Sequence, residues 1–182
     1  MTEVDSTLKS IIDGCLENNR VSQRQLYERY ASRMFAVCRR YANSDEEAED
    51  MLMEGFMKVF KSLETYRGDS PFYPWIRSVM VNAAVSHYRS IRKFRKELNE
   101  SDLYEPIEAV EEEAVTTAMD ARAVIEKLQQ MPETLRVVFN LRALEGHSFD
   151  RIAKMLGKNG SAVRVAYMRA RNWILHELGE RD

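Results

Sequence analysis

The chain has 182 residues, a net charge of −2 at pH 7 and 45% hydrophobic residues, with seven glycines and four prolines. This composition is sufficient for a hydrophobic core and favours long helices over a turn-rich β fold. Because no window of about 18 apolar residues occurs, we expect no membrane-spanning helix. Residues 1–10 lack the basic and apolar regions of a secretion signal, so we expect a cytoplasmic protein.

The cysteines and histidines stand singly along the sequence. Cys15 and Cys38 each lie in a helical pattern, which favours buried, reduced thiols over a disulfide or a metal site. His87, His147 and His176 show no spacing typical of metal ligands. We therefore expect no metal site and no cofactor.

The charges are unevenly distributed, although the net charge is small. Residues 20–96 carry a net charge of +6 and residues 121–182 one of +4, whereas residues 97–120 contain nine acidic residues and no basic one. Phosphate binding depends on such local basic patches and not on the charge of the whole chain. We predict an all-α protein of two small helical domains, 1–96 and 120–182, joined by an acidic flexible linker, 97–119.

Two helices are predicted within residues 1–43. The first covers residues 6–18, and the second begins at Ser22, whose hydroxyl is expected to cap it. The second helix spans about 20 residues and places one apolar stripe in the core. That stripe comprises Leu26, Tyr30, Met34, Val37 and Tyr41.

A third helix is predicted over residues 45–62, with acidic residues in its first turn, where they interact favourably with the helix dipole. One face is apolar and is predicted to pack in the core: Ala48, Met51, Leu52, Gly55, Val59 and Leu63. A second face carries Asp50, Met53, Glu54, Met57 and Lys61. This mixture of methionines and carboxylates fits a solvated surface, or a docking face for another protein, since flexible thioethers suit protein contacts.

The segment 62–96 combines aromatic residues with a basic helix. Residues 66–69 are predicted to form a loop, followed by Ser70 as an N-cap and Pro71 at the first helical position. The helix is expected to end near Arg92 and to bury Phe72, Trp75, Ile76, Val79 and Ala83. Aromatic rings beside arginines suit unpaired nucleic acid, because bases stack on the rings while phosphates contact the guanidinium groups. For the aromatic residues of this helix, burial in the core is the alternative.

Two helices are predicted between the acidic segment and residue 146. The first runs from about Thr117 to Gln130. The second has Pro132 at its first helical position and ends at Gly146.

Residues 146–171 are predicted to form two short helices joined by a tight turn. Ser148 is expected to cap the first helix, Gly157 to end it in the left-handed conformation, and Asn159 to cap the second. The apolar faces comprise Phe149, Ile152, Ala153 and Leu156 in the first helix, and Val163, Tyr167, Ala170, Ile174 and Leu178 in the second. This pattern is typical of a helix-turn-helix, whose second helix enters the DNA major groove. The alternative is an ordinary helical hairpin with a solvated basic face.

Two stretches of the sequence resemble a known family. Residues 27–89, which begin YERYASRMF and end VSHYR, resemble region 2 of the extracytoplasmic-function (ECF) group of bacterial sigma factors. Residues 131–174, which begin MPETLRVVF and end ARNWI, resemble region 4 of the same group. Both occur in the order expected for the family, around a variable linker.

The resemblance implies a function without catalysis. A protein of this kind binds core RNA polymerase and directs it to promoters, and no cofactor is involved. The resemblance also implies control by an anti-sigma factor, and a linker that passes near the RNA exit path of the polymerase.

The resemblance further implies three interfaces. Docking on the clamp helices of the largest polymerase subunit is implied for Asp50, Met53, Glu54 and Met57, with the flap region of polymerase as a further contact. Recognition and melting of the −10 promoter element is implied for Tyr66, Arg67, Phe72, Arg77, Asn82, Tyr88, Arg89, Arg92 and Lys93. Recognition of the −35 element is implied for Lys158, Ser161, Arg164, Val165, Met168, Arg169 and Arg171.

Some positions depart from the family pattern. Met53 stands where a glutamine is frequent, which makes the docking contact at this position more apolar. Pro74 replaces a residue that is usually polar or aromatic. Val165 and Ala166 stand where Ser-Arg is frequent, so we expect DNA binding with an altered −35 sequence.

Two other classes of function are compatible with parts of the sequence. A dimeric helix-turn-helix regulator would need a dimerisation face, and the sequence offers no heptad seam for one. A nucleic-acid enzyme is conceivable because Asp50 and Glu54 share a helix face and could hold a metal ion. No third ligand has a matching context, which disfavours the enzyme.

Overall fold

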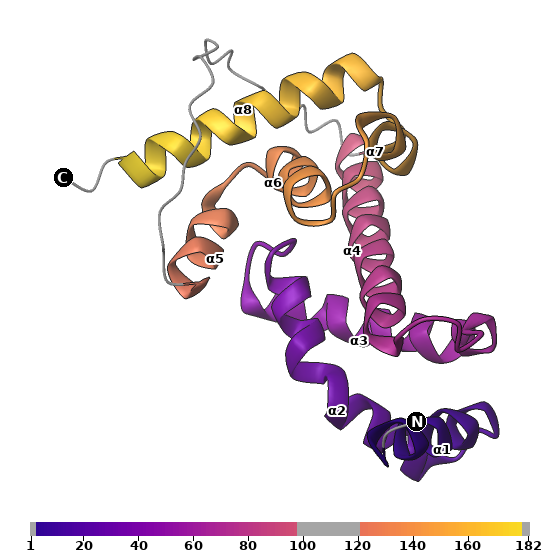
Figure 1. The fold of residues 1–182 in the computed structure, drawn as a ribbon. Helices are drawn as coiled ribbons and strands as arrows, with labels where there is room; N and C mark the ends of the chain where they lie inside the picture. The colour runs from indigo at the N-terminus through magenta and orange to yellow at the C-terminus, as the bar shows by residue number, and fades with distance from the viewer. Residues whose placement is uncertain (1–2, 98–120, 180–182) are drawn as a thin grey trace. The chain divides into compact units, whose positions relative to one another are not determined.

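The computed structural model describes residues 3–97 and 121–179, and every regular element in these two ranges is a helix (Figure 1). The expected all-α class is therefore confirmed. The described residues divide into two compact units, one of residues 3–38 and 45–84, the other of residues 39–44, 85–97 and 121–179. The predicted linker, 97–119, lies outside the described residues except for Glu97, the last residue of a helix.

The first two helices meet at a close approach. Helix α1 covers Glu3–Leu16 and helix α2 covers Arg20–Arg39. Asn19 caps α2, because its Oδ1 accepts hydrogen bonds from the backbone N–H groups of Val21 and Ser22 at 2.9 and 3.2 Å. The prediction that Ser22 caps this helix was wrong. Ser22 instead packs against Gly14 of α1, where an added Cβ would lie only 2.2 Å from the Ser22 hydroxyl oxygen.

The apolar stripes predicted for the second and third helices are both buried. Helix α3 covers Asp45–Ser62, as expected, and is followed by the short 3-10 helix η1, Leu63–Thr65. The stripe of α2 and its extension to Tyr41 is at most 6% exposed. On α3, Gly55 faces Met80, whose sulfur would lie 2.1 Å from an added Cβ. The absence of a side chain at Gly55 thus permits the close packing at this point.

Helix α4, Phe72–Glu97, begins and ends later than predicted. Pro71 directly precedes the helix and is not its first residue, and the helix continues beyond Arg92. Phe72, Ile76 and Ala83 are buried as expected, whereas Trp75 and Val79 are only half-buried.

The C-terminal helices are α5 (Ala121–Gln130), α6 (Glu133–Phe139), α7 (Phe149–Leu156) and α8 (Gly160–Gly179). The expected start of α5 near Thr117 lies outside the described residues. Pro132 is the N-cap of α6, with φ −50° and ψ 132°, and not its first helical residue as predicted. A π-helical turn, η2 (Asn140–Leu144), follows α6 and was not predicted. Helix α8 packs against α6 and α7 (Figure 1).

A small apolar core joins three of these helices. Leu128 near the end of α5, Met131 directly after it, Leu135 of α6 and Ala170 of α8 are at most 3% exposed. The guanidinium of Arg136 is buried beside them, and its Nη1 donates to the backbone carbonyl of Gln129 at 2.9 Å. This arginine therefore satisfies carbonyl groups at the C-terminal end of α5, where helical partners are lacking.

None of the helices that the structure describes is long and apolar enough to cross a membrane.

Candidate nucleic-acid and protein interfaces

The outward face of α3 is exposed over its whole predicted length. Asp50, Met53, Glu54 and Met57 are all solvent-exposed, and the two methionine side chains are 65% and 58% exposed. The opposite side of the helix is anchored in the core, where Phe56 packs against Tyr27 of α2 with ring centroids 4.7 Å apart. Exposed methionines flanked by carboxylates form a surface suited to contact with a protein. We call these four residues the α3 face.

Aromatic rings support the loop that precedes α4. The ring of Tyr66 lies edge-on to Phe72 at 5.0 Å and 5.5 Å from Trp75, measured between ring centroids. The Tyr66 hydroxyl donates to the backbone carbonyl of Ser70 at 2.6 Å, which closes the loop on itself. Gly68 has φ +76°, a conformation that glycine adopts at low cost. The loop is therefore held by its own side chains, with Arg67 exposed at its tip.

The residues predicted for the −10 contact are not equally accessible. Arg67, Asn82, Arg89 and Lys93 are exposed, and Tyr66, Arg77 and Arg92 are half-buried. Phe72 and Tyr88, by contrast, are 3% and 2% exposed. Their rings therefore lie beneath the exposed surface and support it, and a direct contact of either ring with the −10 element stays a prediction.

Tyr88 is hydrogen-bonded both to α6 and within its own helix, and its hydroxyl lies 2.9 Å from Oγ1 of Thr134. Its hydroxyl accepts a hydrogen bond from Nη1 of Arg92 at 3.2 Å, and the Arg92 guanidinium lies 5.9 Å from the ring centroid. Burial raises the pKa of the Tyr88 hydroxyl. A buried phenol that remains protonated is suited to orienting the arginine.

The helix-turn-helix follows the sequence prediction closely. Ser148 Oγ accepts from the Arg151 N–H at 3.2 Å and so caps α7. Gly157 ends α7 with φ 61° and ψ 37°, in the left-handed region. Asn159 Oδ1 accepts from the Ser161 N–H at 3.0 Å at the start of α8. The three residues predicted to cap or end these helices are therefore confirmed.

The two faces of α8 differ in accessibility. Val163 and Ala170 are 0% exposed, and Tyr167 and Ile174 are half-buried, while the side chain of Leu178 lies outside the description. On the outward side, Ser161, Arg164 and Val165 near the helix start are exposed. The remaining predicted −35 residues, Lys158, Met168, Arg169 and Arg171, are half-buried. The N-terminal part of α8 is therefore its more accessible part.

An aromatic and arginine cluster that the sequence analysis missed lies behind this surface. Phe149 lies 5.6 Å from Tyr167, and the Cζ atoms of Arg142 and Arg164 lie 4.7 and 5.6 Å from the Phe149 ring centroid. Arg142 Nη1 also donates to the His147 carbonyl at 3.1 Å. The only sequence signal was an aromatic residue at the first turn of α7, which was assigned to the apolar face alone.

The described residues contain no group of three histidine, cysteine, aspartate or glutamate side chains that could hold a metal ion. Asp50 and Glu54 are both exposed on α3.

Comparisons with known proteins match both halves of the chain. Residues 26–94 match the family model of Sigma-70 region 2, and residues 121–174 match that of Sigma-70, region 4. The chain is 26% identical over 184 residues to the ECF RNA polymerase sigma-E factor of Haemophilus influenzae, covering 94% of this chain and 95% of that protein. It is 30% identical over 156 residues to the RNA polymerase sigma-H factor of Pseudomonas aeruginosa, covering 80% of each.

A solved structure has the same fold. The sigma factor RpoE of Bartonella quintana, in complex with the anti-sigma factor NepR, matches with a TM-score of 0.51 and 19% sequence identity, over 87% of this chain and 98% of that one. Matches to both region models in family order, together with a relative that is 30% identical over 80% of its length, show that this chain belongs to the ECF group of the sigma-70 family of RNA polymerase sigma factors.

Proposed function

We propose that the chain is a transcription initiation factor that binds core RNA polymerase and directs it to promoters through −10 and −35 contacts. One observation carries this proposal: the segments that match regions 2 and 4 each present an exposed surface of suitable chemistry. Its place of action is the cytoplasm, where the polymerase works. The chain itself catalyses no reaction.

The α3 face is proposed to dock on the clamp helices of the largest polymerase subunit. Its two exposed methionines can bury apolar surface in the complex, and its carboxylates favour a basic partner. Met53 replaces the glutamine that is frequent in the family, so this contact gains apolar character. Region 4 would contact the flap region of the polymerase.

The loop at 66–71 and helix α4 are proposed to recognise and melt the −10 element. The aromatic cluster under the loop gives it a fixed frame, so that an unpaired base can be captured with little loss of chain entropy. Arg67, Arg89 and Lys93 are exposed and can contact phosphates. The free energy for melting would come from this capture of unstacked bases, without ATP hydrolysis.

Helix α8 is proposed to enter the major groove at the −35 element. The accessible start of the helix carries Ser161, Arg164 and Val165, which is the part of a recognition helix that contacts base edges. Ala166 cannot supply the basic contact that the family frequently has at this position. The −35 sequence is therefore expected to differ from the usual one.

Two further roles follow from family membership. The acidic segment 97–119 would pass through the basic RNA exit path of the polymerase, and an anti-sigma factor would cover the same faces that bind polymerase. The fold match to a sigma factor solved with its anti-sigma factor supports the second role.

The test is run-off transcription with sigma-free core polymerase on a pool of upstream DNA from the host. Transcript starts are mapped by sequencing, with core polymerase alone as the control. Discrete starts that share two upstream elements would support the proposal. Absence of binding to core polymerase would contradict it and favour a dimeric regulator.

A further inference from the structure

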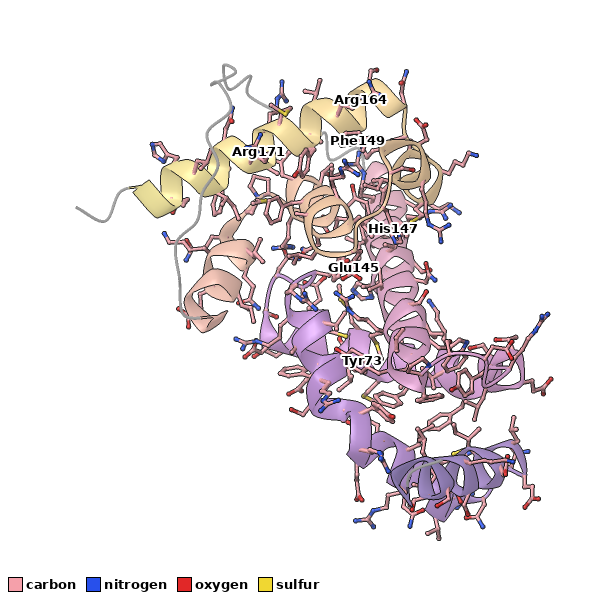
Figure 2. All side chains as sticks on the ribbon, viewed as in Figure 1. Tyr73, Glu145, His147, Phe149, Arg164 and Arg171 are labelled. Carbon is pink, nitrogen blue, oxygen red and sulfur yellow. The ribbon has the colours of Figure 1, made fainter. Side chains whose placement is uncertain are left out.

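Two arginines from different elements lie against the ring of Phe149. Arg142 belongs to the π-helical turn η2, Phe149 is the first residue of α7, and Arg164 is in the second turn of α8. The Cζ atoms of the two arginines lie 4.7 and 5.6 Å from the centroid of the Phe149 ring. Both distances fall within the range of a cation–aromatic attraction. Figure 2 shows Phe149 beside Arg164, with Arg171 further along α8.

The ring that contacts Arg164 is itself fixed. Phe149 is half-buried and meets Tyr167 of α8 edge-on, with centroids 5.6 Å apart and planes inclined at 63°. Tyr167 in turn stacks on Phe139 at 6.3 Å. Arg142 is anchored by its hydrogen bond to the His147 carbonyl, at 3.1 Å. Arg164 is therefore the member of the cluster that is exposed to solvent and able to contact DNA.

A contact of this kind matters because an arginine side chain has many rotamers. An unrestrained guanidinium samples several positions and must be ordered when it binds, which costs free energy and lowers selectivity. A guanidinium held on an aromatic face presents its donors from a limited set of positions. It can then form good hydrogen bonds with one base pair and poor ones with its alternatives.

We propose that Phe149 is a positioning residue for promoter recognition, which holds the Arg164 guanidinium on its ring and thereby sharpens the choice of one base pair in the −35 element. This inference rests on the proposed function, in which α8 enters the major groove. Phe149 does not contact DNA itself. The buried part of α7 is formed by Ile152, Ala153 and Leu156, so the role of Phe149 is separable from the folding of the helix.

The experiment uses the full-length chain with core polymerase, on templates that carry all four base pairs at each position of the −35 element. The variants are Arg164→Ala, Phe149→Leu, Phe149→Tyr and the Arg164→Ala/Phe149→Leu double variant. Leucine keeps an apolar side chain but lacks the aromatic face, while tyrosine keeps that face. Phe139→Leu is the matched control, because it removes a ring that stacks on Tyr167 and not on an arginine.

The proposal predicts a defined pattern. Arg164→Ala abolishes the preference at one base pair, and Phe149→Leu weakens the preference at that same pair about two- to fivefold, the value of one exposed cation–aromatic contact. Phe149→Tyr and Phe139→Leu retain the preference. In the Arg164→Ala background, Phe149→Leu has no further effect on it.

Other results overturn the proposal in distinguishable ways. An unchanged base preference in Phe149→Leu, or an effect that persists without Arg164, would contradict the positioning role and leave the proposed function intact. A base preference that is retained at every −35 position in Arg164→Ala would contradict the contact between Arg164 and the −35 element. If Phe149→Leu lowers the unfolding temperature strongly, Phe149→Met, which keeps a longer apolar side chain, gives the same readout.

Discussion

At the residue scale, the packing of α3 on α4 depends on the absence of a side chain at Gly55. An added Cβ would lie 2.1 Å from the sulfur and 2.7 Å from Cε of Met80, whose side chain is 0% exposed. The end of the Met80 side chain would have to shift within a packed core to make room for a Cβ at residue 55. The position therefore needs glycine for space and not for backbone conformation.

We expect Gly55→Ala to lower the free energy of unfolding by about 1–2 kcal/mol, because the cost of overpacking exceeds the gain in helix propensity. Unfolding in urea is followed by the fluorescence of Trp75 in a Trp173→Phe background. Gly160→Ala is the control, since an added Cβ there would meet its nearest neighbour at 3.8 Å. Equal stability of Gly55→Ala and the parent would contradict this account. Partial rescue by Met80→Val would support it.

Arg136 shows how a charged side chain can be essential to a small core. Its Nη1 donates to the Gln129 carbonyl at 2.9 Å, and longer contacts of 3.4 and 3.5 Å reach the carbonyls of Leu128 and Met131. The Gln129 carbonyl lies in the last turn of α5, and removal of the guanidinium would take away this hydrogen bond.

We expect Arg136→Met to lower the free energy of unfolding of the C-terminal helices by about 1.5–3 kcal/mol, which is the range for a hydrogen bond to a charged group. The measurement is urea unfolding followed by Trp173 fluorescence in a Trp75→Phe background. Arg151→Met, at an exposed arginine of α7, should leave the unfolding midpoint unchanged. A similar small effect for both variants would show that the buried arginine is dispensable.

Residue roles were predictable from sequence where they depend on near neighbours. Ser148, Gly157 and Asn159 were identified because a cap acts on the next few residues of the chain. The prediction of Ser22 as the cap failed because Asn19, three residues earlier, is also a good capping residue and accepts the first backbone N–H groups of α2, while Ser22 packs against Gly14. The burial of Tyr88 and Arg136 depends on contacts with residues distant in sequence, which periodicity does not report.

At the scale of elements, the pKa of His147 in the helix-turn-helix is shifted from its usual value. Burial, and to a smaller extent the charge of Arg151, lower the pKa of His147 below its usual value of 6.5. The unfolded chain therefore takes up a proton at a higher pH than the folded chain does. The contribution of His147 to the free energy of unfolding is complete above the pKa of the unfolded state. It is lost as the pH falls through the pKa of the folded state.

We therefore expect the helix-turn-helix to unfold at a lower urea concentration at about pH 5.5 than at about pH 7.5. The midpoint is measured by Trp173 fluorescence in the Trp75→Phe background. His147→Gln should make the midpoints at the two pH values more similar, whereas His87→Gln, on α4, should not. A pH dependence that is unchanged in His147→Gln would assign it to other groups.

The side chains of the α3 face are exposed and are expected to contribute little to the free energy of folding. Met57 is 58% exposed, so its replacement by a charged residue should not affect stability. In a complex, however, a carboxylate at this position would be buried without its hydration. The effect of such a change is therefore expected on binding alone.

We expect Met57→Glu to weaken binding to core polymerase about tenfold or more, as replacement of a central interface residue commonly does. Affinity is measured by fluorescence anisotropy of the labelled full-length chain titrated with core polymerase. Val21→Glu is the matched control, since Val21 is also apolar and 65% exposed but precedes the matched region 2 segment. Equal losses for both variants would indicate a general charge effect and not a docking site.

At the scale of the whole molecule, separate surfaces of one chain are proposed to carry out separate steps. The loop that Tyr66 closes is proposed to open the −10 element, and the start of α8 is proposed to bind the −35 element as a duplex. The two surfaces lie in different matched regions and have different chemistry, one aromatic and one basic. A defect in one step should therefore leave the other step intact.

The most direct test compares duplex and pre-melted promoters. On duplex DNA, Tyr66→Ala and Arg164→Ala should each reduce run-off transcription about tenfold or more, since each removes a contact needed for the complete reaction. On a template already unpaired at the −10 element, Tyr66→Ala should recover most of its activity and Arg164→Ala should not. Recovery of both variants, or of neither, would contradict the separation of melting from −35 recognition.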